Sequence, residues 1–129
     1  IDKYTNSRKI NEVIKLRDKA AFKNCVIANI SDCFREFIKT YPTSHLKNRA
    51  AHALDSLIFR ERTTKNSFLS YIEFYNSFQR NRFHDASLDS LFSIALRSEK
   101  IWFSDYLAHT FSNDQRIDKV YEKLKDFFF

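Results

Sequence analysis

The sequence predicts an all-α protein of about seven helices, arranged as antiparallel helix pairs that stack into a right-handed α-solenoid. Three observations lead to this class. The 129 residues include no Gly and one Pro, which argues against the turns and hairpins of β structure. A short motif that ends in an aromatic residue recurs along the chain. After each copy, apolar or small residues recur at intervals of four, which is the spacing of one helix face.

The repeated motif is clearest in residues 37–44, Phe-Ile-Lys-Thr-Tyr-Pro-Thr-Ser, and degenerate copies occupy residues 1–7, 74–81 and 106–113. The aromatic residues that close the copies, at spacings of 37, 37 and 33 residues, are Tyr4, Tyr41, Phe78 and Phe111. Periods of this length are typical of stacked repeats. Each copy is expected to form the turn between two paired helices. The Ser, Asn and Asp residues of these turns can accept hydrogen bonds from the free N–H groups of the next helix, and they are Ser44, Asn81, Ser112, Asn113 and Asp114.

The helices follow from this register. Residues 7–23 are expected to form the second helix of a first, incomplete unit. Three pairs follow, with helices at 24–41 and 45–61, 67–78 and 82–97, and 101–111 and 115–128. The sequence therefore predicts one repeat domain, 1–129, with units at about 1–23, 24–61, 67–97 and 101–128. Because the helix that should precede Tyr4 is missing, we expect a piece of a longer protein.

One segment resembles the tetratricopeptide-like (TPR-like) helical repeats, and in particular a divergent bacterial subtype with a Phe-(Ile/Leu)-x-x-Tyr-Pro-x-Ser turn between its helices. The matching positions are Phe37, Ile38, Tyr41, Pro42 and Ser44 in the turn, and Ala50 and Leu54 in the second helix. The resemblance extends over essentially the whole chain. It implies a non-catalytic scaffold that binds other proteins, with the first helix of each pair lining a concave face. It also implies a location in the cell envelope, where this subtype occurs in lipoproteins and multidomain scaffold proteins.

Aligning the first helices of the pairs gives the surface expected to bind a protein or peptide. The positions outside the core are Asp32, Arg35, Glu36, Lys39, Leu69, Ile72, Glu73 and Asn76. Leu69 and Ile72 place apolar side chains where the preceding unit has charged ones, so they form a candidate peptide site. Packing against the adjoining helix is the alternative for both. Trp102 is a candidate to cover the end of the groove, with core packing as its alternative.

The sequence predicts no enzyme, no cofactor and no metal site. The four histidines, which lack the spacing of a metal-binding motif, are His45, His52, His84 and His109. His45 and His52 lie seven residues apart and could share a helix face as a metal pair, but solvated or capping roles fit them better. No run of about 18 apolar residues predicts a membrane-spanning helix.

The net charge of +6, from 22 basic and 16 acidic residues, supports an alternative function. A basic helical module could bind nucleic acid or another polyanion. Protein binding is preferred, because the basic residues are spread over turns and second helices and the motif aromatics occupy core positions. Flanking domains of the same chain are further candidate partners. A homodimer is also an alternative, because an uncapped first unit would leave the apolar face of Ile10, Ile14 and Leu16 unpaired.

The two cysteines, Cys25 and Cys33, are separated by eight positions. On the single helix expected at 24–41 they would lie about 12 Å apart. This exceeds the limit of about 7 Å between the Cα atoms of a disulfide. We therefore expect two small buried hydrophobic residues, with a reactive thiol as the alternative.

Overall fold

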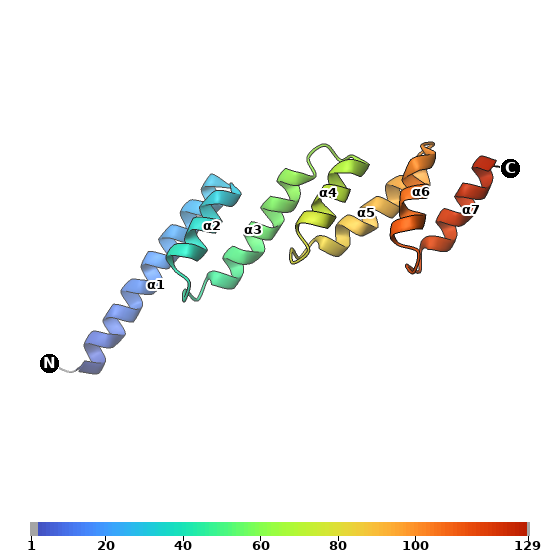
Figure 1. Cartoon of the computed structure of the whole chain (residues 1–129). Coiled ribbons are helices and arrows are strands. Elements are labelled where there is room, and N and C mark those ends of the chain that lie inside the picture. Colours follow the sequence, from blue (N-terminus) through green and yellow to red (C-terminus); the bar gives the residue numbers. More distant parts are fainter. Residues whose placement is uncertain (1–2, 129) are drawn as a thin grey trace. The chain divides into compact units, whose positions relative to one another are not determined.

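The computed structural model describes residues 3–128, and every regular element in that range is a helix. The helices, labelled in Figure 1, are α1 (Lys3–Ala28), α2 (Ser31–Thr40), α3 (Lys47–Arg62), α4 (Phe68–Ser77), α5 (His84–Arg97), α6 (Ile101–Thr110) and α7 (Ile117–Phe128). The prediction of an all-α chain with about seven helices is confirmed for this part of the sequence. From α3 onward, the predicted helix limits agree with the observed ones to within one or two residues.

The chain divides into two compact units, and the boundary between Arg60 and Glu61 lies in the last turn of α3. The amino-terminal unit contains α1, α2 and most of α3. The carboxy-terminal unit contains α4, α5, α6 and α7. The expected stacking of all helix pairs into one solenoid stays a prediction.

Three turns between paired helices repeat the same hydrogen bonds, which explains why the motif recurs in the sequence. An aromatic residue ends the first helix, and its N–H donates to the carbonyl four residues earlier, at 2.9 Å for Tyr41, 2.9 Å for Phe78 and 2.8 Å for Phe111. The φ angles of these residues, −123°, −125° and −123°, suit any amino acid. A side-chain oxygen then accepts the N–H two residues on, at 3.1 Å for Ser44, 2.9 Å for Asn81 and 2.9 Å for Asp114. These three residues are among the Ser, Asn and Asp residues for which the sequence predicts this role, and in the last turn it is Asp114, not Ser112 or Asn113, that makes this hydrogen bond.

The first helix differs from the prediction at both ends. The turn expected after Tyr4 does not form, because α1 runs from Lys3 to Ala28 and passes through that position. The other end of this motif copy, at residues 1–2, lies outside the described residues. The boundary predicted between residues 23 and 24 is also wrong. The chain instead turns at Asn29, whose φ of 55° lies in the left-handed region that ends many helices and whose N–H donates to the Cys25 carbonyl at 2.8 Å.

This turn places Cys25 on α1 and Cys33 on α2, on opposite sides of a tight helical hairpin. Their Cα atoms lie 5.3 Å apart and the two residues form a disulfide. The prediction of two unpaired cysteines is therefore wrong, because it assumed a single helix through both positions. Cys25 is buried in the core and Cys33 packs against that core. The covalent link thus joins α1 to α2 beside the apolar interior.

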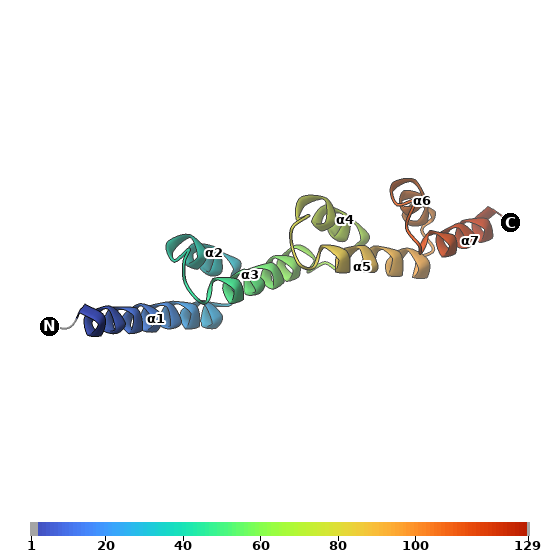
Figure 2. The same ribbon diagram turned by 90° about the horizontal axis from the view of Figure 1, so that it is seen from below.

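The amino-terminal unit has one apolar core between its three helices. Its buried members are Cys25, Phe34, Phe37, Leu46, Ala50 and Leu57. The Phe22 ring packs edge-on against Phe34 and Phe37, with centroids 5.6 Å and 5.9 Å apart. Figure 2 shows α2 to one side of both α1 and α3. The opposite side of α1 and α3 is therefore free of α2.

The carboxy-terminal unit repeats the alternation, with α4 and α6 on the same side of α5 and α7 (Figure 2). The Phe68 ring of α4 stacks on the Phe103 ring of α6, with centroids 4.2 Å apart. The position nine residues after Tyr41, Phe78 and Phe111 is fully buried, and it holds Ala50, Ser87 and Val120. The equivalent position after Tyr4, Val13, is 64% exposed, in keeping with the missing turn there. This is the small packing position that the sequence indicates for the second helix of each pair.

Candidate functional site

The four residues expected to bind a partner on α2 are all exposed. Asp32, Arg35, Glu36 and Lys39 occupy the face of α2 opposite the buried Phe34 and Phe37. The Arg35 guanidinium pairs with the Asp32 carboxylate, and both side chains are more than half exposed. Such surface pairs contribute little to stability. The face is therefore polar, mixed in charge and open to solvent.

The predicted residues of α4 are less uniform. Leu69 is 57% exposed, and Glu73 and Asn76 are exposed as well. Ile72 is half-buried, and both of its alternatives, peptide binding and packing against the adjoining helix, stay predictions. Leu69 is thus the apolar side chain of this pair that is available to a partner.

Trp102 packs against other aromatic rings, as its core-packing alternative expects, while its role at the end of a groove stays a prediction. Its ring is 46% exposed, yet it packs edge-on against Phe68 at 5.4 Å and Phe103 at 4.5 Å between centroids. Phe68 thereby joins the starts of α4 and α6. Leu69 follows Phe68 in the chain, and Ile101, also exposed, precedes Trp102. We call Leu69, Ile101 and Trp102 the α4–α6 patch. Sequence reasoning missed Ile101 because it adjoins a polar connector.

The structure thus groups the predicted site residues by unit. The α2 residues share one helix of the amino-terminal unit, and the residues of α4 lie in the same unit as Trp102. One continuous surface across all of them stays a prediction.

A groove that the sequence did not indicate lies in the amino-terminal unit between α1 and α3. It has a volume of about 590 Å³ and is lined by Lys19, Phe22, Lys23, Val26, His45, Leu46 and Arg49. Three of these seven residues are Lys or Arg, and a fourth is His. The four lining residues from α1 follow the spacing i, i+3, i+4, i+7, which from the sequence alone indicates that they share one helix face. The contribution of α3 could not be read from it.

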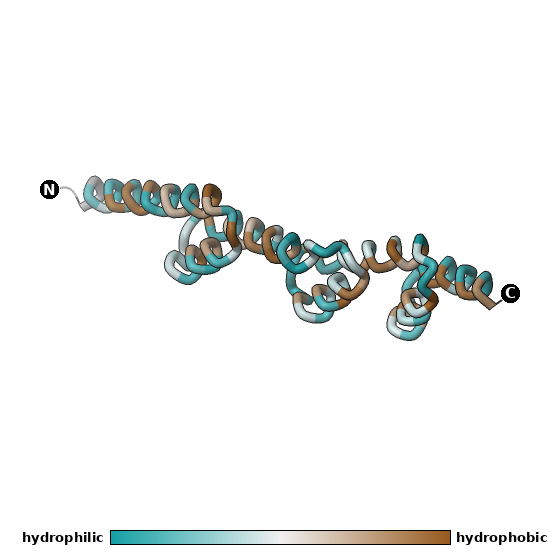
Figure 3. The backbone as a smooth tube through the Cα atoms, turned by 90° about the horizontal axis from the view of Figure 1, so that it is seen from above, coloured by the Kyte–Doolittle hydropathy of each residue, from teal (hydrophilic) through white to brown (hydrophobic). Residues whose placement is uncertain are grey.

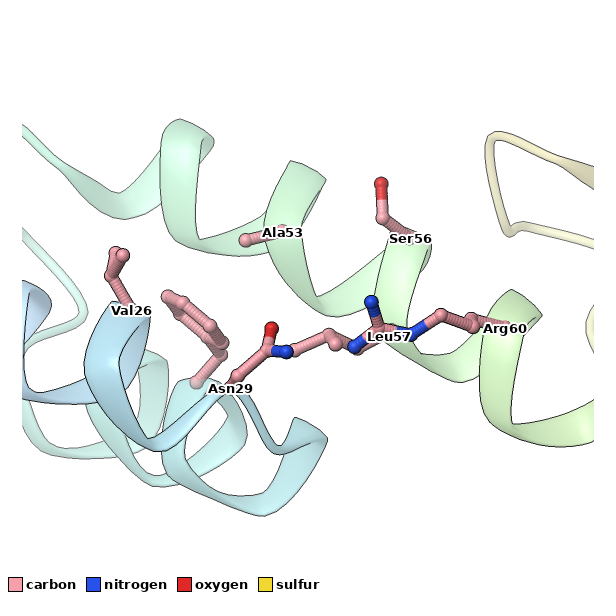
Figure 4. A pocket seen from close by; sticks show the side chains of 7 residues that line it. Val26, Asn29, Ala53, Ser56, Leu57 and Arg60 are labelled. Atoms are coloured by element: carbon pink, nitrogen blue, oxygen red, sulfur yellow. The ribbon is translucent and has the colours of Figure 1, made fainter.

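A second pocket adjoins the basic groove and shares Val26 with it. This pocket, of about 320 Å³, is shown in Figure 4 and is lined by Val26, Asn29, Phe34, Ala53, Ser56, Leu57 and Arg60. Figure 4 shows Val26 and Asn29 on one wall and the α3 residues on the other. The two hollows therefore follow the same edge of α3.

Asp18 fixes the turn beside the basic groove. Its carboxylate is 1% exposed and accepts hydrogen bonds from the Arg17 guanidinium at 3.0 Å and 2.8 Å, and from the Ser44 hydroxyl. Burial by itself raises the pKa of the Asp18 carboxyl. The hydrogen bonds from Ser44 and Arg17, together with the nearby positive charge, outweigh burial and hold this pKa below its ordinary value. The side chain thus ties α1 to the turn before α3 as an anion.

Arg116 has the corresponding role in the carboxy-terminal unit. Its guanidinium bonds the Asp114 carboxylate at 2.9 Å and 3.0 Å, pairs with Asp89 of α5, and lies 4.4 Å from the centroid of the Phe92 ring. The hydrogen bonds from Arg116 lower the pKa of the Asp114 carboxyl. The same pairing raises the pKa of Arg116. This cluster therefore serves packing between α5 and the turn before α7.

His84 and His109 make structural contacts. The His84 ring stacks on Tyr75 at 4.0 Å between centroids, and its Nε2 lies 3.1 Å from the Tyr75 carbonyl oxygen. His109 Nδ1 lies 2.8 Å from the Asp105 carbonyl oxygen. Within residues 3–128, no three His, Cys, Asp or Glu side chains gather in a way that could hold a metal ion.

The apolar face predicted to be unpaired at the start of the chain is exposed. Ile10, Ile14 and Leu16 are accessible on α1, as is Val13. Along α1, Figure 3 shows hydrophobic and hydrophilic stretches of the chain in alternation. None of the described helices has the length and hydrophobicity needed to span a bilayer. Comparisons of this chain with protein families, with curated proteins and with solved structures found no match.

Proposed function

We propose that this chain is a helical-repeat scaffold that binds another protein and carries out no chemistry. The observation that supports it most is the threefold repetition of one turn, with the same backbone and side-chain hydrogen bonds at Tyr41, Phe78 and Phe111. Repeated helix pairs that bury one stripe present rigid, preformed surfaces, so little conformational entropy is lost when a partner binds. In this proposal the pairs stack as a TPR-like right-handed solenoid within a larger bacterial protein.

The α4–α6 patch is the proposed contact surface for the partner. Leu69 and Trp102 supply exposed apolar area at the joined starts of two first helices. Glu73 and Asn76 add polar groups along the same helix. An apolar centre with a polar rim is the usual composition of a protein-binding surface.

The Cys25–Cys33 disulfide bears on the compartment in which the scaffold works. Structural disulfides persist in oxidising compartments and are rare in the cytosol. The link therefore favours the cell envelope over the cytoplasm.

Affinity capture from the source lysate tests the proposed function, with Leu69→Asp as the diagnostic variant. Wild type is expected to retain one or a few proteins in high salt, where surface charges are screened. Leu69→Asp should lose them, because a charge at the centre of an apolar contact must be desolvated. Ile27→Asp, the same kind of change at a side chain of α1 that is 73% exposed, is the matched control and should retain them. Equal retention by both variants and wild type would remove the α4–α6 patch from the proposal.

A basic module that binds nucleic acid is the second candidate, favoured by the net charge of +6. It predicts that the captured material is nucleic acid released at moderate salt, because counterion release dominates such binding. That result would replace the scaffold proposal.

A further inference from the structure

The basic groove between α1 and α3 combines an apolar floor with a cationic rim. Phe22, Val26 and Leu46 form the floor. Lys19, Lys23, His45 and Arg49 surround it, and each of these four side chains is exposed. Among the described residues that line the groove there is no Asp or Glu. A complementary ligand would carry negative charges around an apolar group.

The net positive charge of the chain belongs to the amino-terminal unit, which contains the groove. Residues 1–60 contain 12 Lys and Arg against 6 Asp and Glu, which leaves the full net charge of +6. Residues 61–129 contain 10 basic and 10 acidic residues and are neutral overall. A field of this kind draws acidic partners toward the amino-terminal unit and raises their association rate.

The floor favours a protein ligand over nucleic acid. Recognition of single strands relies on bases that stack on open aromatic faces. The Phe22 ring is not open in this way, because the Arg49 guanidinium lies 5.2 Å from its centroid and the rings of Phe34 and Phe37 pack against it. What remains accessible is aliphatic surface, notably Val26, which is 53% exposed. Aliphatic surface fits the Leu, Ile or Phe side chain of a peptide.

The length of the hollow also fits a peptide. The second pocket continues the groove from Val26 along α3, so the lined edge extends from Arg49 to Arg60. Eleven helical steps correspond to about 16 Å. That length accommodates about five residues of extended chain. A peptide with one apolar side chain against Val26 and acidic residues on either side of it would place negative charges near both Arg49 and Arg60.

The walls of the groove are fixed before any ligand arrives. The Cys25–Cys33 disulfide holds α1 to α2 next to Val26. The buried Asp18 carboxylate holds α1 to Ser44, next to His45. Preorganised walls lower the entropic cost of binding.

We infer that this groove is a docking site for an acidic segment of a partner protein that inserts an apolar side chain at Val26. The inference rests on the proposed function, since it adds a second surface and a ligand chemistry to the same scaffold. The groove and the α4–α6 patch are different surfaces, so an experiment can exclude one as a binding site and leave the other in place.

Fluorescence anisotropy with a labelled synthetic peptide tests the docking site. The probe has the pattern Asp-Leu-Asp-Asp-Phe-Asp-Asp-Leu, and a matched peptide replaces its apolar residues by Ser at the same charge. A single-stranded oligonucleotide of equal charge is the third ligand. Lys23→Glu/Arg49→Glu is the diagnostic variant, and both side chains are exposed, so the fold is expected to be retained. Lys65→Glu/Arg80→Glu makes the same charge change at exposed sites of the carboxy-terminal unit and is the control.

The apolar acidic peptide should bind wild type and the control variant alike. It should bind Lys23→Glu/Arg49→Glu at least about tenfold more weakly, and the Ser peptide should bind wild type about tenfold more weakly. Equal affinity for the two peptides, or tighter binding of the oligonucleotide, would overturn the inference in favour of a polyanion surface. Lack of saturable peptide binding up to about 1 mM would overturn it outright. Loss of peptide binding in Leu69→Asp alone would move the site to the α4–α6 patch and leave the proposed function standing.

Discussion

Asp18 shows why some residues of this fold were predictable and others were not. Asp18 pairs with Ser44, and the capping role of Ser44 could be predicted from the sequence. A turn residue that caps the next helix makes its hydrogen bond within two residues. The same Ser44 hydroxyl, in the turn before α3, also donates to Asp18, which lies on α1 and is distant in the sequence. Such a contact depends on how α1 packs, and a single sequence carries no record of it. The role of Asp18 therefore emerged only from the structure.

Asp18→Asn is expected to lower the free energy of unfolding by about 1–3 kcal/mol at neutral pH, because the charge-assisted hydrogen bonds of a buried group are lost. The folded pKa lies below the ordinary value of 3.8. The contribution of the carboxylate is therefore complete above the unfolded pKa and disappears as the pH falls through the folded pKa. Thermal melts of wild type and variant should differ at neutral pH and converge in strong acid. Glu12→Gln, at an exposed position of α1, is the control. Identical melts of Asp18→Asn and wild type at neutral pH would contradict this role.

At the scale of elements, the paired helices after residue 45 followed from the sequence because each of their turns is specified locally. The α1–α2 hairpin did not follow, because the repeat register implied a turn after Tyr4 and none forms there. The actual break depends on one residue, Asn29, in a left-handed conformation. A helix end displaced from residue 23 to Ala28 put the two cysteines on facing helices and reversed the conclusion about the disulfide. The basic groove was missed for a related reason, since its two walls are far apart in the sequence.

Removal of the disulfide by Cys25→Ala/Cys33→Ala should lower the free energy of unfolding by about 2–3 kcal/mol, as expected when a loop with a sequence separation of 8 is released. Chemical denaturation with and without a reductant measures this effect. Reductant should lower the stability of wild type by a similar amount and leave that of the variant unchanged. The variant is therefore the control for any effect of the reductant that does not involve the disulfide. A reductant effect of equal size on both proteins would show that the cysteines are not the source.

At the scale of the molecule, the all-helical class and the repeat were predictable because composition and period are properties of the whole chain. The charge asymmetry between the two units was also present in the sequence, but it acquired meaning only with the boundary between Arg60 and Glu61. The proposed solenoid is the remaining step. In such arrays each repeat contacts its neighbours alone, so the molecule lengthens as repeats are added.

Small-angle X-ray scattering of the monomer should therefore give a radius of gyration clearly above the value of about 14 Å expected for a compact protein of this length. The same measurement reports molecular mass and hence tests the homodimer considered for the exposed end of α1. Val13→Asp on that face is the control, because it should abolish a dimer without changing the radius of the monomer. A monomer radius near the compact value would rule out the solenoid.

The turns of this chain also affect its unfolded state. The three aromatic residues that end first helices all have negative φ, and the two described residues with positive φ are Asn29 and Asn66. Within residues 3–128 positive φ is thus confined to two Asn residues, so no described position depends on Gly, and the sequence contains none. An unfolded chain without Gly samples fewer backbone conformations, and each avoided Gly is worth about 0.4–1 kcal/mol where the native backbone is unstrained. Part of the stability of this protein thus comes from the narrowness of its denatured ensemble, which no inventory of native contacts would reveal.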